Sequence, residues 1–227
     1  MKSANKKYYA PLTESFELCA DETKAISMKK YLLNKFEFFG ITAPERKILL
    51  KQFISDNGLP EKKEFKRVIK ELWLLPQREY QLCAIEVLEK NINTCDENHI
   101  KLLEHLITNK SWWDTVDFIA AKLVGRFFEN YPGLTRTYIN KWLGSDNMWL
   151  QRTAIIFQLK YKKNTDYKLL FSCIQKCSGS KEFFIRKAIG WALREYAKTD
   201  PEKVIAFVEN NSLSPLSKKE ALRRITF

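Results

Sequence analysis

The chain has 227 residues, of which 45% are hydrophobic and 29% are charged, with only 7 glycines and 7 prolines. This composition excludes a disordered or collagen-like chain and favours helices over a turn-rich β fold. The formal net charge of +12 favours an anionic partner, with nucleic acid first and a membrane surface second.

The positive charge is concentrated in the second half of the chain. Residues 1–100 hold 17 Lys and Arg against 15 Asp and Glu, whereas residues 101–227 hold 22 against 12. We therefore expect an anionic partner to lie mainly along residues 101–227.

Apolar residues recur with helical spacing along the chain. Trp112, Val116, Ile119 and Leu123 follow the i, i+4, i+7, i+11 pattern of one buried helix face. The same pattern recurs at Leu150, Ala154, Phe157 and Tyr161, and at Ile185, Ile189, Ala192 and Tyr196. Short polar, Gly or Pro breaks separate the helices at residues 56–60, 75–76, 130–133, 144–147, 178–180 and 199–201. No segment alternates as a strand would, so the sequence predicts an all-α protein.

Four of the predicted helices begin alike, with a polar start followed by an aromatic residue. These aromatic residues are Tyr80, Trp113, Trp149 and Phe184, separated by 33, 36 and 35 residues. A period in this range made of two helices is typical of HEAT or TPR-type solenoids, whose stacked pairs form a concave surface. No linker interrupts the pattern, so we expect residues 1–227 to form a single domain.

The five cysteines show no paired spacing, and with two histidines they do not complete a zinc ligand set. We expect reduced and mostly buried cysteines, as in a cytosolic protein, and no metal site. Residues 1–11 are basic but no apolar run follows them, so no signal peptide is expected. No apolar stretch is long enough to span a bilayer.

Trp113 and Asp117 lie four residues apart on one predicted helix and therefore share a face that borders its core stripe. An indole beside a carboxylate is suited to holding a cation, because the ring face attracts positive charge and the carboxylate neutralises it. Two alternatives stay open at this point. Asp117 could form a structural ion pair with Arg152, and Trp113 could be an inter-helix packing residue.

Corresponding helices of the next two repeats contribute Arg152 and Trp191. Gly190, beside Trp191, is unusual inside a helix and indicates a close approach of another segment. Each residue alone fits a core or ion-pair role. The combination, from three successive repeats in the basic half, favours a site.

The segments that carry these residues, 111–117, 145–152 and 181–196, resemble the AlkD-type bacterial DNA alkylation repair enzymes. The resemblance covers almost the whole chain and includes residues 39–41 with 44–46, and 71–73 with 75–76. It implies a HEAT-like solenoid that excises N3- and N7-alkylated purines. It also implies a catalytic carboxylate at Asp117, lesion-flanking indoles at Trp113 and Trp191, and a DNA-phosphate contact at Arg152.

Thr42 departs from the family pattern, in which we expect a longer polar side chain. The departure puts a minor contact to the opposite DNA strand in doubt, but not the chemistry. The residues expected to grip duplex DNA non-specifically are basic, namely Lys160, Lys162, Lys163, Arg186, Lys187 and Arg194. No lysine has a Schiff-base context, so we expect a monofunctional glycosylase without lyase activity and without a cofactor.

The alternative hypothesis is a non-catalytic HEAT-repeat module that binds DNA or a protein. Such a module would keep the charge and the repeat but would not need a carboxylate flanked by tryptophans. No predicted helix sets a basic face against a clean apolar one, which disfavours a membrane partner. We expect a monomer that acts on alkylated duplex DNA in the bacterial cytoplasm, at the nucleoid.

Overall fold

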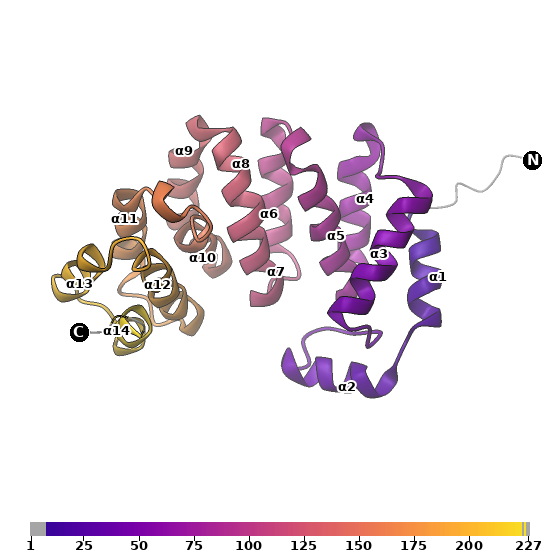
Figure 1. Ribbon diagram of the computed structural model, residues 1–227, viewed down its shortest axis with the longest axis horizontal. Coiled ribbons are helices and arrows are strands. Elements are labelled where there is room, and N and C mark those ends of the chain that lie inside the picture. The colour runs from indigo at the N-terminus through magenta and orange to yellow at the C-terminus, as the bar shows by residue number, and fades with distance from the viewer. Residues whose placement is uncertain (1–7, 224, 226–227) are drawn as a thin grey trace, which may run out of the picture. The chain divides into compact units, whose positions relative to one another are not determined.

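The computed structural model describes residues 8–223 and 225, and the regular elements of these residues are helices, with no strand among them (Figure 1). This confirms the predicted all-α fold. The chain divides into two compact units, one ending at Lys90 and one beginning at Asn91. The single-domain and whole-chain solenoid arrangements stay predictions.

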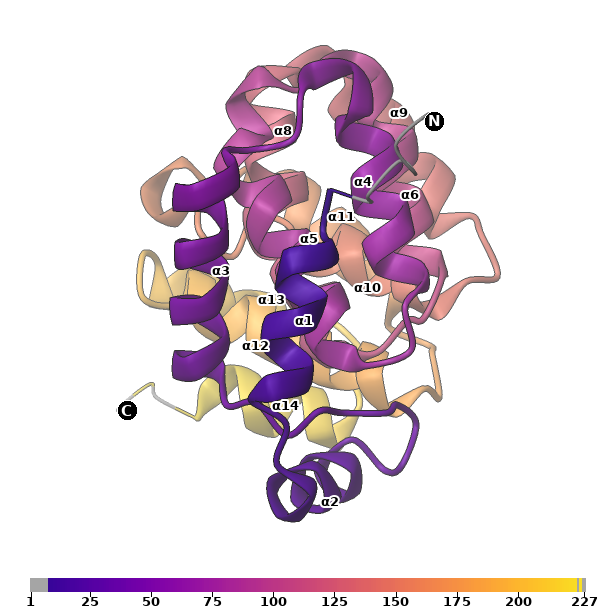
Figure 2. The same cartoon turned by 90° about the vertical axis from the view of Figure 1, so that its right-hand side faces the viewer.

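The described residues of the first unit form five helices: α1 (Ala10–Leu18), α2 (Glu22–Tyr31), α3 (Ala43–Asn57), α4 (Lys62–Leu74) and α5 (Arg78–Asn91), the last of which ends one residue into the second unit. Figure 2 shows α1 beside α3, with α2 extending away from both. Thr42 is the N-cap of α3, and its backbone N–H and hydroxyl both donate to the Glu45 carboxylate. Thr42 therefore has a local capping role that explains a short side chain there.

A buried glutamate ties the segment before α3 to α5. Glu79 is 1% exposed, and its Oε1 accepts the backbone N–H of Gly40 at 3.0 Å and of Ile41 at 3.2 Å. Beside it, the Arg78 N–H donates to the Glu37 carbonyl at 2.8 Å. Burial raises the pKa of Glu79, although the backbone donors favour its charged form.

The second unit contains nine α-helices among its described residues: α6 (Ile100–Thr108), α7 (Trp113–Phe118), α8 (Gly125–Asn130), α9 (Pro132–Leu143), α10 (Met148–Ile156), α11 (Tyr167–Cys177), α12 (Phe183–Tyr196), α13 (Pro201–Glu209) and α14 (Pro215–Leu222). Short 3-10 turns span Ile92–Thr94, Glu97–His99 and Lys162–Asn164. The predicted breaks all fall between helices or at their ends. Helix α10 contacts α7 and α12, and α12 contacts α14, so these helices lie side by side.

The predicted apolar stripes form the core of this unit. Val116, Ile119 and Leu123 are fully buried, as are Ile185 and Ile189 on α12. The stripe that begins at Leu150 is buried through Phe157, while Tyr161 at its end is half-buried. One feature differs from the prediction, because the helix that begins at α7 passes through a π-helical segment, Ile119–Val124, before it continues as α8.

Four of the five cysteines are buried, and all five are free thiols, as predicted. Burial raises the pKa of Cys173 to about 12 and that of Cys177 to about 11. The pKa of Cys83 is also raised by burial, whereas Cys19 is exposed. In the part of the chain that the structure describes, no helix has the length and apolarity needed to cross a membrane.

Candidate active site

The site lies where the first turns of three helices of the second unit meet. Three aromatic rings hold these turns together: Trp112 precedes α7, Trp149 opens α10 and Phe184 opens α12. The Trp112 ring lies 5.7 Å from that of Trp149 and 5.1 Å from that of Phe184, and the latter two are 5.1 Å apart. Edge-to-face and tilted contacts at these distances stabilise packing beyond the area they bury. The aromatic residues at the helix starts therefore fix the register of α7, α10 and α12.

Helix α10 begins where its sequence predicts. The Asn147 side chain accepts the backbone N–H groups of Trp149 at 2.9 Å and Leu150 at 3.2 Å, which caps the helix. Arg152 then falls one turn inside α10 and faces α7. On α7, Asp117 follows Trp113 by one turn, as the sequence predicts.

An open cavity of about 320 Å³ lies among α7, α10, α12 and α14. We call it the cleft, and its lining residues are Trp113, Asp117, Arg152, Phe183, Phe184, Lys187, Trp191, Arg194 and Glu220. The structure thus brings together six of the ten residues that the sequence singles out: Trp113, Asp117, Arg152, Lys187, Trp191 and Arg194. The other four, Lys160, Lys162, Lys163 and Arg186, do not line the cleft, and Lys160 is exposed in the turn after α10.

Asp117 and Arg152 form a two-pronged ion pair on the wall of the cleft. Arg152 Nε donates to Asp117 Oδ1 at 2.7 Å, and Arg152 Nη2 donates to Asp117 Oδ2 at 2.8 Å. The remaining terminal nitrogen, Nη1, donates to the Phe184 carbonyl at 2.5 Å. The guanidinium is thus locked between α7 and α12, and its planar fork sets the orientation of the carboxylate.

The carboxylate still reaches the cleft. The Asp117 side chain is 18% exposed, whereas the Arg152 side chain is 5% exposed. Burial raises the pKa of Asp117 above its ordinary value, and the Arg152 guanidinium opposes that rise. Each carboxylate oxygen has lone-pair capacity beyond its bond to Arg152. Asp117 can therefore accept a hydrogen bond from a bound molecule or stabilise a positive charge beside it.

Helix α12 contributes a continuous stripe to the cleft. Lys187, Trp191 and Arg194 follow one another at i, i+4 and i+7 and all line it. Phe183, one turn before Lys187, is 56% exposed at the rim. The opposite face of α12 is the apolar stripe of the core, so this helix separates the cleft from the interior.

Glu220 on α14 is a cleft residue that sequence reasoning missed. Its carboxylate pairs with Lys187 at 2.9 Å and with Arg194 at 2.5 Å. The one signal in the sequence was Gly190, predicted to mark a close approach. That prediction is confirmed, since a Cβ there would lie 2.4 Å from Glu220 Cβ and 2.9 Å from the Ser217 carbonyl oxygen.

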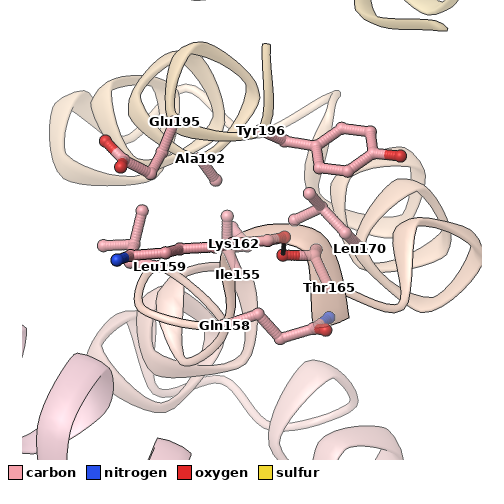
Figure 3. Close-up of a pocket in the computed structure, with 9 residues that line it drawn as sticks. All are labelled: Ile155, Gln158, Leu159, Lys162, Thr165, Leu170, Ala192, Glu195 and Tyr196. Atoms are coloured by element: carbon pink, nitrogen blue, oxygen red, sulfur yellow. Dashed lines mark hydrogen bonds between the residues drawn. The ribbon is translucent and has the colours of Figure 1, made fainter. Parts of the chain in front are cut away.

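A second, much smaller cavity of about 20 Å³ lies on the other side of α12 (Figure 3). Figure 3 shows Ala192 between Glu195 and Tyr196 on its α12 side. On the opposite side the Thr165 hydroxyl donates to the Lys162 carbonyl at 2.8 Å. This space holds about one water molecule, which is too little for a nucleotide or a small-molecule substrate.

The chain is similar to proteins of known structure. A solved structure described as a predicted DNA alkylation repair enzyme from Enterococcus faecalis is 31% identical. It superposes with a TM-score of 0.85 over 91% of this chain and 97% of that one. The structure of smu.31 from Streptococcus mutans UA159 is 18% identical and has a TM-score of 0.61, over 80% of this chain and 98% of that one, which shows a shared fold. No curated protein matches the chain.

The sequence profile of one family, described as DNA alkylation repair enzyme, matches residues 12–225 and so covers both units, including every residue of the cleft. The match and the Enterococcus faecalis likeness agree with the resemblance noted in the sequence. The chain belongs to the DNA alkylation repair enzyme family, which gives it a role in DNA repair.

Proposed function

We propose that the protein is a monofunctional DNA glycosylase that hydrolyses the N-glycosidic bond of cationic N3- and N7-alkylated purines in duplex DNA. The observation that carries the proposal is the Asp117 carboxylate, fixed by Arg152 on the wall of a cleft that Trp113 and Trp191 also line. Binding alone does not require a partly buried carboxylate, because DNA is itself an anion.

Alkylation at N3 or N7 gives the purine a positive charge and weakens its bond to the sugar. As that bond breaks, positive charge moves to the sugar and the base departs neutral, so no general acid is needed. The transition state resembles an oxocarbenium ion, as in glycoside hydrolysis. A carboxylate held nearby stabilises that charge more than it stabilises the ground state.

In this mechanism Asp117 is the catalytic residue and also orients the attacking water. The water oxygen bonds to the anomeric carbon while the carbon–nitrogen bond breaks, and its proton passes to the carboxylate or to solvent. Trp113 and Trp191 contact the sugar and stabilise the developing charge through their ring faces. No separate base-binding pocket is needed, so bulky cationic adducts should be accepted.

Arg152 acts first as the residue that positions Asp117, because its guanidinium nitrogens contact Asp117 and the Phe184 carbonyl. Its predicted contact with a DNA phosphate stays a prediction. Arg194, within the cleft, and Lys160, on the exposed turn after α10, are proposed to bind phosphates flanking the lesion. We propose that the enzyme acts as a monomer in the bacterial cytoplasm, with a HEAT-like concave basic surface against the duplex and no cofactor.

The test is single-turnover release of 7-methylguanine from a duplex oligonucleotide by wild type and Asp117→Asn. The variant should bind DNA and release the base about 10² to 10³ times more slowly, the usual effect of losing an electrostatic stabiliser. Asp114→Asn is the matched control, because Asp114 lies on the same helix but does not line the cleft. It should retain near-wild-type release.

Wild-type protein that binds DNA yet releases neither 7-methylguanine nor 3-methyladenine above the buffer rate would make it a binding module. Efficient release of uracil would also contradict the mechanism, because uracil is a neutral base that needs leaving-group activation. Thermal unfolding of each variant distinguishes lost chemistry from lost structure.

A further inference from the structure

Two of the cations that line the cleft share one carboxylate. Lys187 Nζ lies 2.9 Å from Glu220 Oε1, and Arg194 Nη1 lies 2.5 Å from Glu220 Oε2. The Glu220 side chain is 15% exposed, against 38% for Lys187 and 20% for Arg194. The Lys187 and Arg194 contacts hold the pKa of Glu220 below its usual range, so it is ionised at neutral pH.

The position of Glu220 is built into the packing of α12 against α14. Gly190 leaves space that only a hydrogen can occupy, since a Cβ would lie 2.4 Å from Glu220 Cβ. Nearby, the hydroxyl of Ser217, which is 1% exposed, donates to the Arg186 carbonyl at 2.9 Å. Glu220 is therefore held against the wall by contacts on both sides and is not a mobile surface charge.

The cations that line the cleft have opposite effects on two parts of the substrate. DNA phosphates are attracted by Lys187 and Arg194, but a cationic purine and an oxocarbenium-like sugar are repelled by the same groups. In the net charge of the cleft, Arg152 already balances Asp117, so Lys187 and Arg194 are in excess without a further anion. Glu220 supplies the missing negative charge on the α12 side of the cleft.

We propose that Glu220 is a positioning and charge-balancing residue that sets the specificity of the cleft for a cationic lesion. It orients Lys187 and Arg194 and screens their charge from the reacting sugar, while it weakens affinity for the DNA backbone. This inference rests on the proposed glycosylase function. It predicts a split that a purely structural role would not produce, namely tighter DNA binding with slower base release.

The experiment compares wild type with Glu220→Gln, Glu220→Asp and Glu209→Gln. We measure affinity for an undamaged duplex at two salt concentrations and single-turnover release of 7-methylguanine from the lesion-containing duplex. Glu220→Gln should bind the undamaged duplex several-fold more tightly, and the gain should shrink as salt rises. It should release 7-methylguanine about tenfold more slowly, as expected for one charge acting across a partly buried site.

Three controls make the result specific. Glu209→Gln changes the net charge equally at an exposed site on α13 outside the cleft and should leave both quantities unchanged. Glu220→Asp keeps the charge and should recover most of the release rate. Combining Glu220→Gln with Lys187→Gln removes one negative and one positive charge, so the net charge of the cleft returns to its wild-type value. Release should then return toward the wild-type rate, a recovery that a role of Glu220 in packing alone does not predict.

Equal loss of binding and release in Glu220→Gln, or failure of the double variant to recover release, would overturn the proposal. If wild type itself releases no base, the glycosylase function fails instead. In that case the binding measurements still test Glu220, because unchanged affinity in Glu220→Gln would refute its opposition to the DNA backbone.

Discussion

At the scale of single residues, the planar fork of the Arg152 guanidinium contributes more to stability than its charge does. Arg152→Lys keeps the cation but replaces two parallel hydrogen bonds to Asp117 by one point contact, and it cannot also reach the Phe184 carbonyl. The free energy of unfolding should fall by about 1–3 kcal/mol, as for a buried polar group that loses a partner. Denaturant titration measures this loss.

Arg136→Lys is the matched control for that substitution. Arg136 is 75% exposed on its side chain and lies 3.7 Å from Asp166, so its charge pair is solvated. This change should leave the stability of the protein unaltered. Equal effects of the two substitutions would show that the cleft does not depend on a two-pronged pair.

Glu79 should make stability depend on pH in the opposite sense to a carboxyl group whose pKa is lowered on folding. Burial raises the pKa of Glu79 in the folded state, so the folded protein binds a proton more readily than the unfolded chain. Glu79 does not lower the free energy of unfolding below the pKa of the unfolded chain, where it is protonated in both states. Its stabilising protonated form is lost as pH rises through the folded pKa, and the protein then becomes less stable.

Glu79→Gln removes this titration while keeping an oxygen for the Gly40 and Ile41 N–H groups. The stability of the variant relative to wild type should therefore increase between about pH 4 and pH 7, as the wild-type protein loses the stability of its protonated form. Unfolding curves across this range, with the exposed Glu61→Gln as control, measure the difference. A gap between variant and wild type that does not change with pH would contradict the assignment.

The sequence predicted which side chains of α7, α10 and α12 would share a cleft, because the repeat places them at corresponding positions and the family resemblance assigns them. Glu220 was not predictable in the same way. No spacing within α14 distinguishes it from Lys219 beside it, and its importance arises from contacts with residues 26 and 33 positions earlier. Only Gly190 indicated that another helix would come close.

At the scale of elements, the close contact of α12 with α14 depends on the absence of a side chain at Gly190. Gly190→Ala must push α14 away, because the atoms that its methyl group would meet at 2.4 and 2.9 Å include the Ser217 backbone carbonyl oxygen. We expect a loss of about 1–3 kcal/mol of stability from this overpacking. Displacement of α14 should also separate Glu220 from Lys187 and Arg194.

Gly133→Ala is the control for the same chemical change. Gly133 lies in the first turn of α9, and its added methyl group would meet no packed neighbour within 4 Å, so alanine should be neutral or slightly stabilising. Thermal unfolding compares the two variants. Similar midpoints for both would show that α12 and α14 can separate without loss of stability.

The π-helical segment Ile119–Val124 could not be predicted, for a physical reason. A π turn shifts the helical register by one residue, which is visible in a sequence only if the helix has a polar face. Here Ile119, Ala120, Ala121, Leu123 and Val124 are all buried, and Lys122 is the one exposed polar residue of the segment, so a single position is too little to reveal the shift. The apolar pattern predicts the helix correctly but does not specify its turns.

At the scale of the whole molecule, the excess positive charge predicts how DNA binding responds to salt. With about four to eight phosphates neutralised, the logarithm of the association constant should fall with the logarithm of salt at a slope of about −4 to −7. Titrations of undamaged duplex at several salt concentrations measure the slope. Lys160→Gln should reduce it by about one unit if this exposed lysine binds a phosphate.

A control for that titration is Lys70→Gln, which removes one exposed charge from α4, in the less basic first half of the chain. It should change the slope less than Lys160→Gln does. A slope near zero for wild type would mean that the net charge of +12 serves some partner other than DNA.

The burial of four cysteines also affects how the protein reacts with the alkylating agents that damage DNA. Alkylating agents that modify purines also attack thiolates, so an exposed reactive cysteine would make the protein a target of the agent. The raised pKa values of Cys173 and Cys177, about 12 and 11, keep these sulfurs protonated and poorly nucleophilic inside the core. Treatment of the folded protein with a methylating agent, followed by peptide mass spectrometry, should modify Cys19 before any other cysteine. Methylation would then be confined to Cys19, while the buried cysteines of the core stay unmodified.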